Sequence, residues 1–181
     1  AEQSVRAYSM QALKDGEACW CPIVSLELWN GAGGERERAV LRQFERVLAK
    51  TTQVIGAPLE GRTVAVWGLT FKAGTDDLRD SPAIEIATRM VAAGATLRAF
   101  DPEVAADTHV IDGLTAVGDP YEACAGADAL VVLTEWPEFG RVDLDRVADE
   151  LRSPAVVDTR NVLDRRALAR RGFAYQGIGR A

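Results

Sequence analysis

The amino-acid sequence predicts an α/β fold with a mainly parallel sheet and helices on both faces. The first observation is Thr63–Trp67, a short β-branched apolar run typical of a buried strand. The second is Ala129–Leu133, a continuous apolar run typical of a central parallel strand. The third is the alternation of strand and helix patterns from residue 63 onward, at the spacing of βαβ units. Together these observations favour a Rossmann-like sheet, preceded by an α-helical N-terminal segment.

The unit from Arg62 to Asp101 sets the pattern. A polar loop follows the first strand, and Ser81 stands at the position of a helix N-cap with Pro82 as the first helical residue. Gly94 marks the end of this helix. Further strands are expected at Thr96–Phe100, Ala155–Val157 and Phe173–Gln176, further helical stretches at Pro120–Ala125, Leu144–Leu151 and Leu168–Arg171, and a loop at Val104–Val117.

Two parts of the chain are predicted, a helical segment of residues 1–56 and a Rossmann-like domain of residues 57–181. The helical segment has candidate helices at Ser4–Leu13, Ile23–Trp29 and Glu35–Ile55. The last of these carries a regular apolar stripe, and the run NGAGG before it is a break between segments.

Composition narrows the class of protein. The chain has 181 residues and a formal net charge of -6, which argues against a nucleic-acid-binding face. It has no apolar run long enough to span a bilayer and only three cysteines, so a cytoplasmic, reducing setting is the default. Neither the Cys19-Trp20-Cys21 pair nor the lone His109 has the partners of a metal site, and we expect Cys124 to be a core residue.

Polar side chains follow three of the predicted strands. Parallel strands bring their carboxyl ends to one edge of a sheet, so Lys72 and Arg160 should meet there. Two such cations suit a diphosphate, which arginine can bind through its bidentate fork. An alternative is that these cations are neutralised locally, Arg160 by Asp158 or Asp164 and Lys72 by Asp76 or Asp77. The residue pattern alone leaves both possibilities open.

The stretch GLTFKAGTDDLRDSPAIEI resembles the opening of the C-terminal, UDP-binding domain of the UDP-glucose/GDP-mannose dehydrogenase family. The resemblance continues through DPYEACAGADALVVLTEWPEF, VVDTRNVLD and GFAYQGIGR, and covers about Leu59 to Arg180. It implies that Phe71, Lys72 and Arg160 contact a UDP-sugar substrate, and that Arg79 reaches toward NAD held by another domain. Glu135 and Trp136 belong to a TEW motif whose expected role is structural.

The resemblance also implies what this chain lacks. Members of the family are NAD-dependent oxidoreductases that convert a sugar C6 alcohol to a carboxylate through a catalytic cysteine. The 181 residues contain neither the GxGxxG turn that would bind NAD nor that cysteine motif, so we assign no catalytic residue and expect no turnover by the chain alone. It would then work with an N-terminal dehydrogenase half or as a homodimer joined through Glu35–Ile55. The alternative is a stand-alone UDP-sugar-binding module.

A second resemblance concerns residues 19–45. WCPIVSLELWNGAGGERERAVLRQF is similar to the middle of PIN-domain ribonuclease toxins, in which the glutamate matching Glu27 is one of several acidic Mg²⁺ ligands. One carboxylate cannot hold a catalytic magnesium. This similarity raises the alternative of a fusion that carries a nuclease remnant.

Overall fold

The computed structural model describes residues 35–178. The predicted helices Ser4–Leu13 and Ile23–Trp29, and Glu27 with them, lie outside this range. The described part begins with helix α3 (Glu35–Ile55), as expected from its apolar stripe. The remaining helices are α4 (Pro82–Ala92), α5 (Pro120–Cys124), α6 (Leu144–Glu150) and α7 (Arg165–Arg170), with a 3₁₀ turn η1 (Pro137–Arg141).

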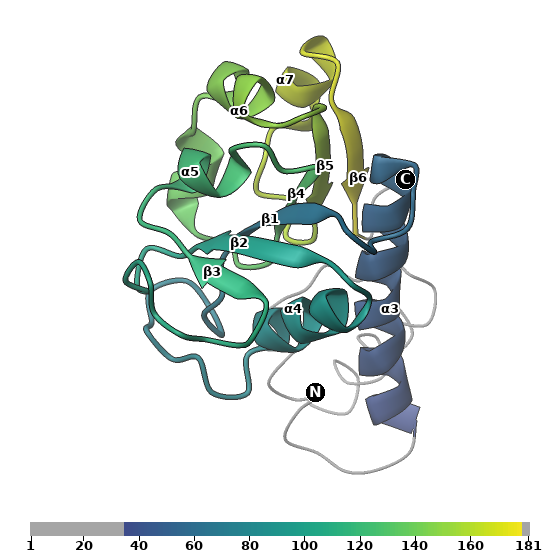
Figure 1. The fold of residues 1–181 in the computed structure, drawn as a ribbon, viewed down its shortest axis with the longest axis vertical. Coiled ribbons are helices and arrows are strands. Elements are labelled where there is room, and N and C mark those ends of the chain that lie inside the picture. Colours follow the sequence, from purple (N-terminus) through teal and green to yellow (C-terminus); the bar gives the residue numbers. More distant parts are fainter. Residues whose placement is uncertain (1–34, 179–181) are drawn as a thin grey trace, which may run out of the picture.

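Six parallel strands form the sheet, in the order β3-β2-β1-β4-β5-β6 (Figure 1). The predicted α/β fold with a parallel sheet is confirmed. The strands are β1 (Thr63–Trp67), β2 (Thr96–Phe100), β3 (Leu114–Ala116), β4 (Ala129–Val132), β5 (Ala155–Asp158) and β6 (Ala174–Gly177). The prediction of a loop throughout Val104–Val117 was wrong, because Leu114–Ala116 pairs with β2 as an edge strand.

Helices cover both faces of the sheet, as predicted. On one face α3 and α4 share a core with Val64 and Val66 of β1. On the other face α5, α6 and α7 share a core with Ala65 and Trp67 of the same strand. Figure 1 shows these two groups of helices on opposite sides of the strands. Because successive residues of a strand point to opposite faces, one apolar strand feeds both cores.

Helix α3 belongs to the first of these cores. Phe44 and Val47 are buried in it, and the helix contacts β4, β5 and β6. Lys50 reaches the edge strand, donating from Nζ to Oε1 of Gln176 over 2.8 Å. The division of the chain near residue 56 stays a prediction. Among residues 35–178, no helix has the length and apolar character needed to cross a membrane.

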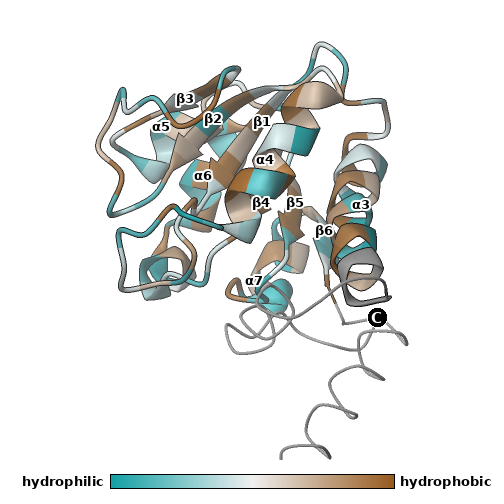
Figure 2. Cartoon of the chain, turned by 90° about the horizontal axis from the view of Figure 1, so that it is seen from below, coloured by the Kyte–Doolittle hydropathy of each residue, from teal (hydrophilic) through white to brown (hydrophobic). Residues whose placement is uncertain are grey.

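Local signals in the sequence account for the helix starts. Ser81 caps α4 by accepting from the backbone N–H of Ala83, and Asp119, Asp143 and Asp164 cap the three short helices in the same way. Strands β1, β4 and β5 in the middle of the sheet are coloured mainly as apolar in Figure 2, in keeping with burial on both faces. Cys124 is fully buried, as predicted, and desolvation raises the pKa of its thiol to about 12. His109 lies on an exposed loop, also as predicted.

Candidate nucleotide-sugar site

Three loops leave the carboxyl edge of the sheet side by side. They follow β1, β4 and β5, which are consecutive and parallel in the sheet. The first loop carries Phe71, Lys72 and Arg79, and the third carries Arg160. In open α/β sheets this edge is where ligands bind, outside the ends of the strands. The three loops therefore start from the same edge of the sheet, and the meeting of Lys72 and Arg160 there stays a prediction.

A buried carboxylate, Asp101 at the end of β2, ties the loops together. Asp101 is 1% exposed. Its Oδ2 accepts hydrogen bonds from Leu69 N (2.7 Å), Thr70 N and Thr70 Oγ1 (both 3.0 Å). The indole N–H of Trp136 donates to the same oxygen over 3.1 Å. Asp101 thereby joins the base of the β1 loop to the β4 loop. The expected structural role of Trp136 agrees with these bonds.

A close backbone crossing holds the β1 and β4 loops against each other. Gly68 has φ +91, and a Cβ on it would lie 2.6 Å from the backbone nitrogen of Thr134. The hydroxyl of Thr134 donates to the carbonyl of Thr70 over 2.9 Å. Only glycine combines this φ with this proximity. The bases of the two loops are therefore fixed before any ligand binds.

The β1 loop is closed on itself farther out. Phe71 N donates to Asp77 O over 2.9 Å, and the Ser81 hydroxyl donates to the carbonyl of Leu69 over 2.7 Å. The Phe71 ring is half-buried at this closure, whereas Lys72 is exposed. Within residues 35–178, no ion pair involves Lys72. The alternative that Lys72 is neutralised by Asp76 or Asp77 finds no support here.

Arg79, and not Lys72, pairs with Asp77. Its Nε lies 2.9 Å from Asp77 Oδ1 and its Nη2 lies 3.0 Å from Oδ2, a bidentate pair on the surface. The hydrogen bond from Arg79 lowers the pKa of Asp77. The side chain of Arg79 is 88% exposed.

Arg160 is deeply placed. Its side chain is 3% exposed, its Nε donates to the carbonyl of Leu133 over 2.7 Å, and the same atom lies 3.2 Å from Glu135 Oε2. The two acidic residues predicted as alternative partners do not pair with its guanidinium. Asp158 accepts the backbone N–H groups of Arg160 and Leu163, and Asp164 caps α7. Arg160, in the loop after β5, is thus paired with a residue in the loop after the neighbouring strand β4.

The environment of Asp158 is set by burial. Desolvation raises its pKa above 3.8, and hydrogen bonds from four backbone N–H groups, beginning with that of Leu163, act in the opposite direction. The neighbouring Thr159 turns its hydroxyl into the sheet, where it donates to Val132 O over 2.7 Å.

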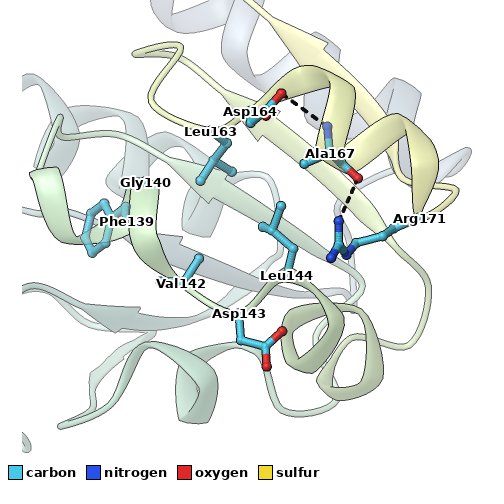
Figure 3. A pocket seen from close by; sticks show the side chains of 9 residues that line it. All are labelled: Phe139, Gly140, Val142, Asp143, Leu144, Leu163, Asp164, Ala167 and Arg171. Atoms are coloured by element: carbon cyan, nitrogen blue, oxygen red, sulfur yellow. Dashed lines mark hydrogen bonds between the residues drawn. The ribbon is translucent and has the colours of Figure 1, made fainter.

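A cavity of about 280 Å³ opens at the same edge, on the side of α6 and α7 (Figure 3). Its lining comes from the segments after β4 and β5 and from the end of α7: Phe139, Gly140, Val142, Asp143, Leu144, Leu163, Asp164, Ala167 and Arg171. None of the four predicted site residues is among them. Both carboxylates in the lining cap short helices, and Arg171 is paired with Asp145 at 2.6 Å. The groups that could bind a ligand there are already engaged.

The described residues do not supply a dinucleotide site of their own. The loop between β1 and α4 holds only Gly68 and Gly74, too few for the glycine turn that approaches a pyrophosphate. The described residues also hold no cluster of three or more histidine, cysteine or acidic side chains that could bind a metal ion.

Three residues that hold the loops of this edge together were missed or given a minor place by reasoning from the sequence. The sequence analysis placed Asp101 at the end of a strand and Glu135 in a structural motif, and it gave Thr134 no role. Each one acts through a residue far away in the chain, so no local spacing announces it. The one signal in the sequence is that polar residues stand at the ends of apolar runs.

The comparisons with known proteins agree on one family. A model of the UDP binding domain of the UDP-glucose/GDP-mannose dehydrogenase family matches residues 65–165. UDP-glucose 6-dehydrogenase of Rhizobium meliloti (strain 1021) is 41% identical over 160 residues, which cover 88% of this chain and 35% of that protein. The enzyme of the same name from Pseudomonas aeruginosa is 39% identical over 77% of this chain and 32% of its own length.

Solved structures give the same result. A UDP-glucose dehydrogenase from Pyrobaculum islandicum superposes with a TM-score of 0.60 at 31% identity, over 81% of this chain and 32% of that one. A UDP-D-ManNAc dehydrogenase from Pyrococcus horikoshii gives a TM-score of 0.65 at 25% identity, over 91% of this chain and 40% of that one.

The extent of these matches bears on two expectations. The chain spans about a third of the length of the curated relatives that it matches. Because the Rhizobium match covers 88% of the chain, it includes part of the segment Cys19–Glu45. The match with a dehydrogenase therefore extends into that segment, and the comparisons do not support the PIN-like resemblance. The chain belongs to the UDP-glucose/GDP-mannose dehydrogenase family and contains its UDP binding domain.

Proposed function

We propose that residues 57–181 hold the diphosphate and uridine of a UDP-glucose-type nucleotide sugar for an NAD-dependent UDP-sugar 6-dehydrogenase. One observation carries the proposal: Lys72 and Arg160 leave the same sheet edge, in a chain whose residues 65–165 match a UDP binding domain. Their strands, β1 and β5, are separated only by β4, hence by about 10 Å at the usual spacing. Long cationic side chains on two such loops can reach one diphosphate.

The proposed roles follow from the side chains. Lys72 supplies an exposed point charge, and Arg160 a planar fork suited to phosphate oxygens. The half-buried ring of Phe71 offers an apolar surface beside Lys72. Arg79, exposed at the outside of the loop, is proposed to reach toward NAD bound by another domain. No step of the oxidation is assigned to these residues, because the described residues do not form the NAD site.

Catalysis would require a second half. The 181 residues hold no GxGxxG turn, and the buried Cys124 has a thiol pKa of about 12, which makes it a poor nucleophile. We propose that the UDP binding domain acts with an N-terminal dehydrogenase half and that α3 contributes to a dimer. NADH formation from UDP-glucose by the purified chain alone would contradict this requirement.

Calorimetric titration tests the proposal. UDP, UDP-glucose, UDP-N-acetylglucosamine and GDP-mannose are titrated into the chain, then into Lys72→Ala and Arg160→Ala variants. Saturable binding of uridine nucleotides that weakens in both variants supports the site. The matched control is Arg62→Ala at the opposite edge of the sheet, where Asp128 keeps Arg152 as a second partner at 3.3 Å. The proposal is refuted if the folded chain binds none of these nucleotides, or binds them unchanged in both variants.

A further inference from the structure

Glu135 forms an ion pair with Arg160, one of the groups on which the proposed site depends. The Arg160 side chain is 3% exposed, and that of Glu135 is 29% exposed. Oε2 of Glu135 is itself buried and accepts no hydrogen bond from within residues 35–178. Its interaction with Arg160 is thus an ion pair at 3.2 Å without good hydrogen-bond geometry, since the Nε–H points to Leu133 O.

Only 3% of the Arg160 side chain is exposed, so its guanidinium must gain exposure before a diphosphate can reach it. Carboxylate and phosphate oxygens use the same donors of an arginine, so the two compete for Arg160. They also repel each other, because both are negatively charged. We propose that Glu135 is a built-in competitor for Arg160, which leaves the guanidinium when the diphosphate of a nucleotide binds. This inference rests on the proposed function and adds a determinant of its affinity.

The surroundings of Glu135 favour a side-chain rotation over a movement of the loop. The residue before it, Thr134, is bonded to Thr70 O, and the residue after it, Trp136, is bonded to Asp101. The backbone of Glu135 is held on both sides by these bonds. On the other side of the pair, the backbone N–H of Arg160 is bonded to Asp158 at 3.0 Å. The proposed exchange of partners is therefore a change of rotamer in the two long side chains, in which Arg160 Nε also gives up or keeps its bond to Leu133 O.

The exchange also gives the site a preference among ligands. A ligand with a diphosphate replaces the interaction that Arg160 loses, and it does so with two negative charges in place of one. Uridine alone offers Arg160 no anion, so it leaves the ion pair closed. The competitor therefore lowers the affinity for a diphosphate and leaves that for uridine unchanged.

The test is Glu135→Gln, which keeps the size of the side chain and removes its charge. We expect UDP to bind the variant about tenfold more tightly, with the gain in the association rate constant measured by stopped flow. Binding of uridine should be unchanged. The control is Glu138→Gln, which removes the same charge from an exposed neighbour and should leave UDP binding as it is. Thermal melts establish that both variants fold.

The outcomes separate this inference from the proposed function. If the wild-type chain does not bind UDP, the proposed function fails and the competitor with it. If UDP binds and Arg160→Ala weakens it, but Glu135→Gln leaves the affinity unchanged or lowers it, the site stands and the competitor is refuted. An equal gain for uridine and UDP would also refute it, because uridine has no group that displaces Glu135.

Discussion

Removing the buried charge of Asp101 should loosen the candidate site and destabilise the whole domain. One oxygen of Asp101 receives four hydrogen bonds and the other receives the N–H of Glu103 at 3.0 Å. In Asp101→Asn the amide oxygen can face the four donors only if the amide nitrogen faces Glu103 N. That placement leaves one donor unsatisfied, at a cost of about 1–3 kcal/mol, and turns charge-assisted bonds into weaker neutral ones.

The expected loss in the free energy of unfolding is therefore about 3 kcal/mol for Asp101→Asn. Asp101→Ala leaves at least three donors from Leu69, Thr70 and Trp136 without their acceptor and should cost about 5 kcal/mol or more, close to the whole stability of many domains. Urea unfolding followed by far-UV circular dichroism measures both values. The control is Asp112→Asn, an exposed carboxylate whose change should stay within about 0.5 kcal/mol.

A loss below about 1 kcal/mol in Asp101→Asn, similar to the control, would refute the reasoning that this carboxylate joins the loops. A second measurement follows from the same geometry. The base of the β1 loop carries Phe71 and Lys72, so the affinity for UDP should fall in Asp101→Asn at concentrations of urea where the variant is still folded.

Three further predictions concern other features. Gly68→Ala should destabilise by about 3–5 kcal/mol through its positive φ and its clash with the β4 loop, whereas Gly74→Ala, with open space around it, should cost only about 1 kcal/mol of strain; equal losses in urea unfolding would contradict this. With the other two cysteines changed to serine, Cys124 should react with a disulfide reagent only when the chain unfolds. Its thiol pKa is about 12, so at about pH 8 roughly one thiol in ten thousand is ionised in the folded chain. Rapid modification of the folded chain would count against the burial of Cys124. Backbone N–H groups of α7 lower the pKa of Asp164. The stabilisation by Asp164 is therefore complete at pH values above its ordinary pKa of 3.8 and is lost as the pH falls through the lowered pKa. The difference in urea midpoint between wild type and Asp164→Ala should shrink in acid, and a difference that grows in acid would contradict this.

Local signals in the sequence were enough to predict most of the fold. Thr63–Trp67 and Thr96–Phe100 are strands over the predicted residues, and Ser81 caps α4 as expected. The strand that was missed, Leu114–Ala116, has only three residues and lies between Gly113 and Gly118. Such a run is too short to show alternation. It is a strand because β2 offers it a free edge, which is a property of the sheet.

The contacts of the candidate site were much harder to predict. Asp158 and Asp164 are close to Arg160 in sequence and were reasonable partners, but backbone N–H groups occupy both carboxylates. Arg160 therefore pairs with Glu135, which is brought close by the pairing of β4 with β5. Partners of this kind depend on strand order, and strand order does not follow from periodicity. The roles of Phe71, Lys72, Arg79 and Arg160 in binding stay predictions.

The position of β1 in the middle of the sheet has a consequence for folding during synthesis. β1 pairs with β2 on one side and with β4 on the other, and Ala129 lies roughly twice as far along the chain from β1 as Thr96. Non-local parallel pairing is slow, because a long loop must close before its contacts form. The β1–β2 half can assemble early, with one side of β1 still open. Until β4 and β5 have emerged from the ribosome, this side is an exposed apolar edge, and the nascent chain is most prone to aggregate in that interval.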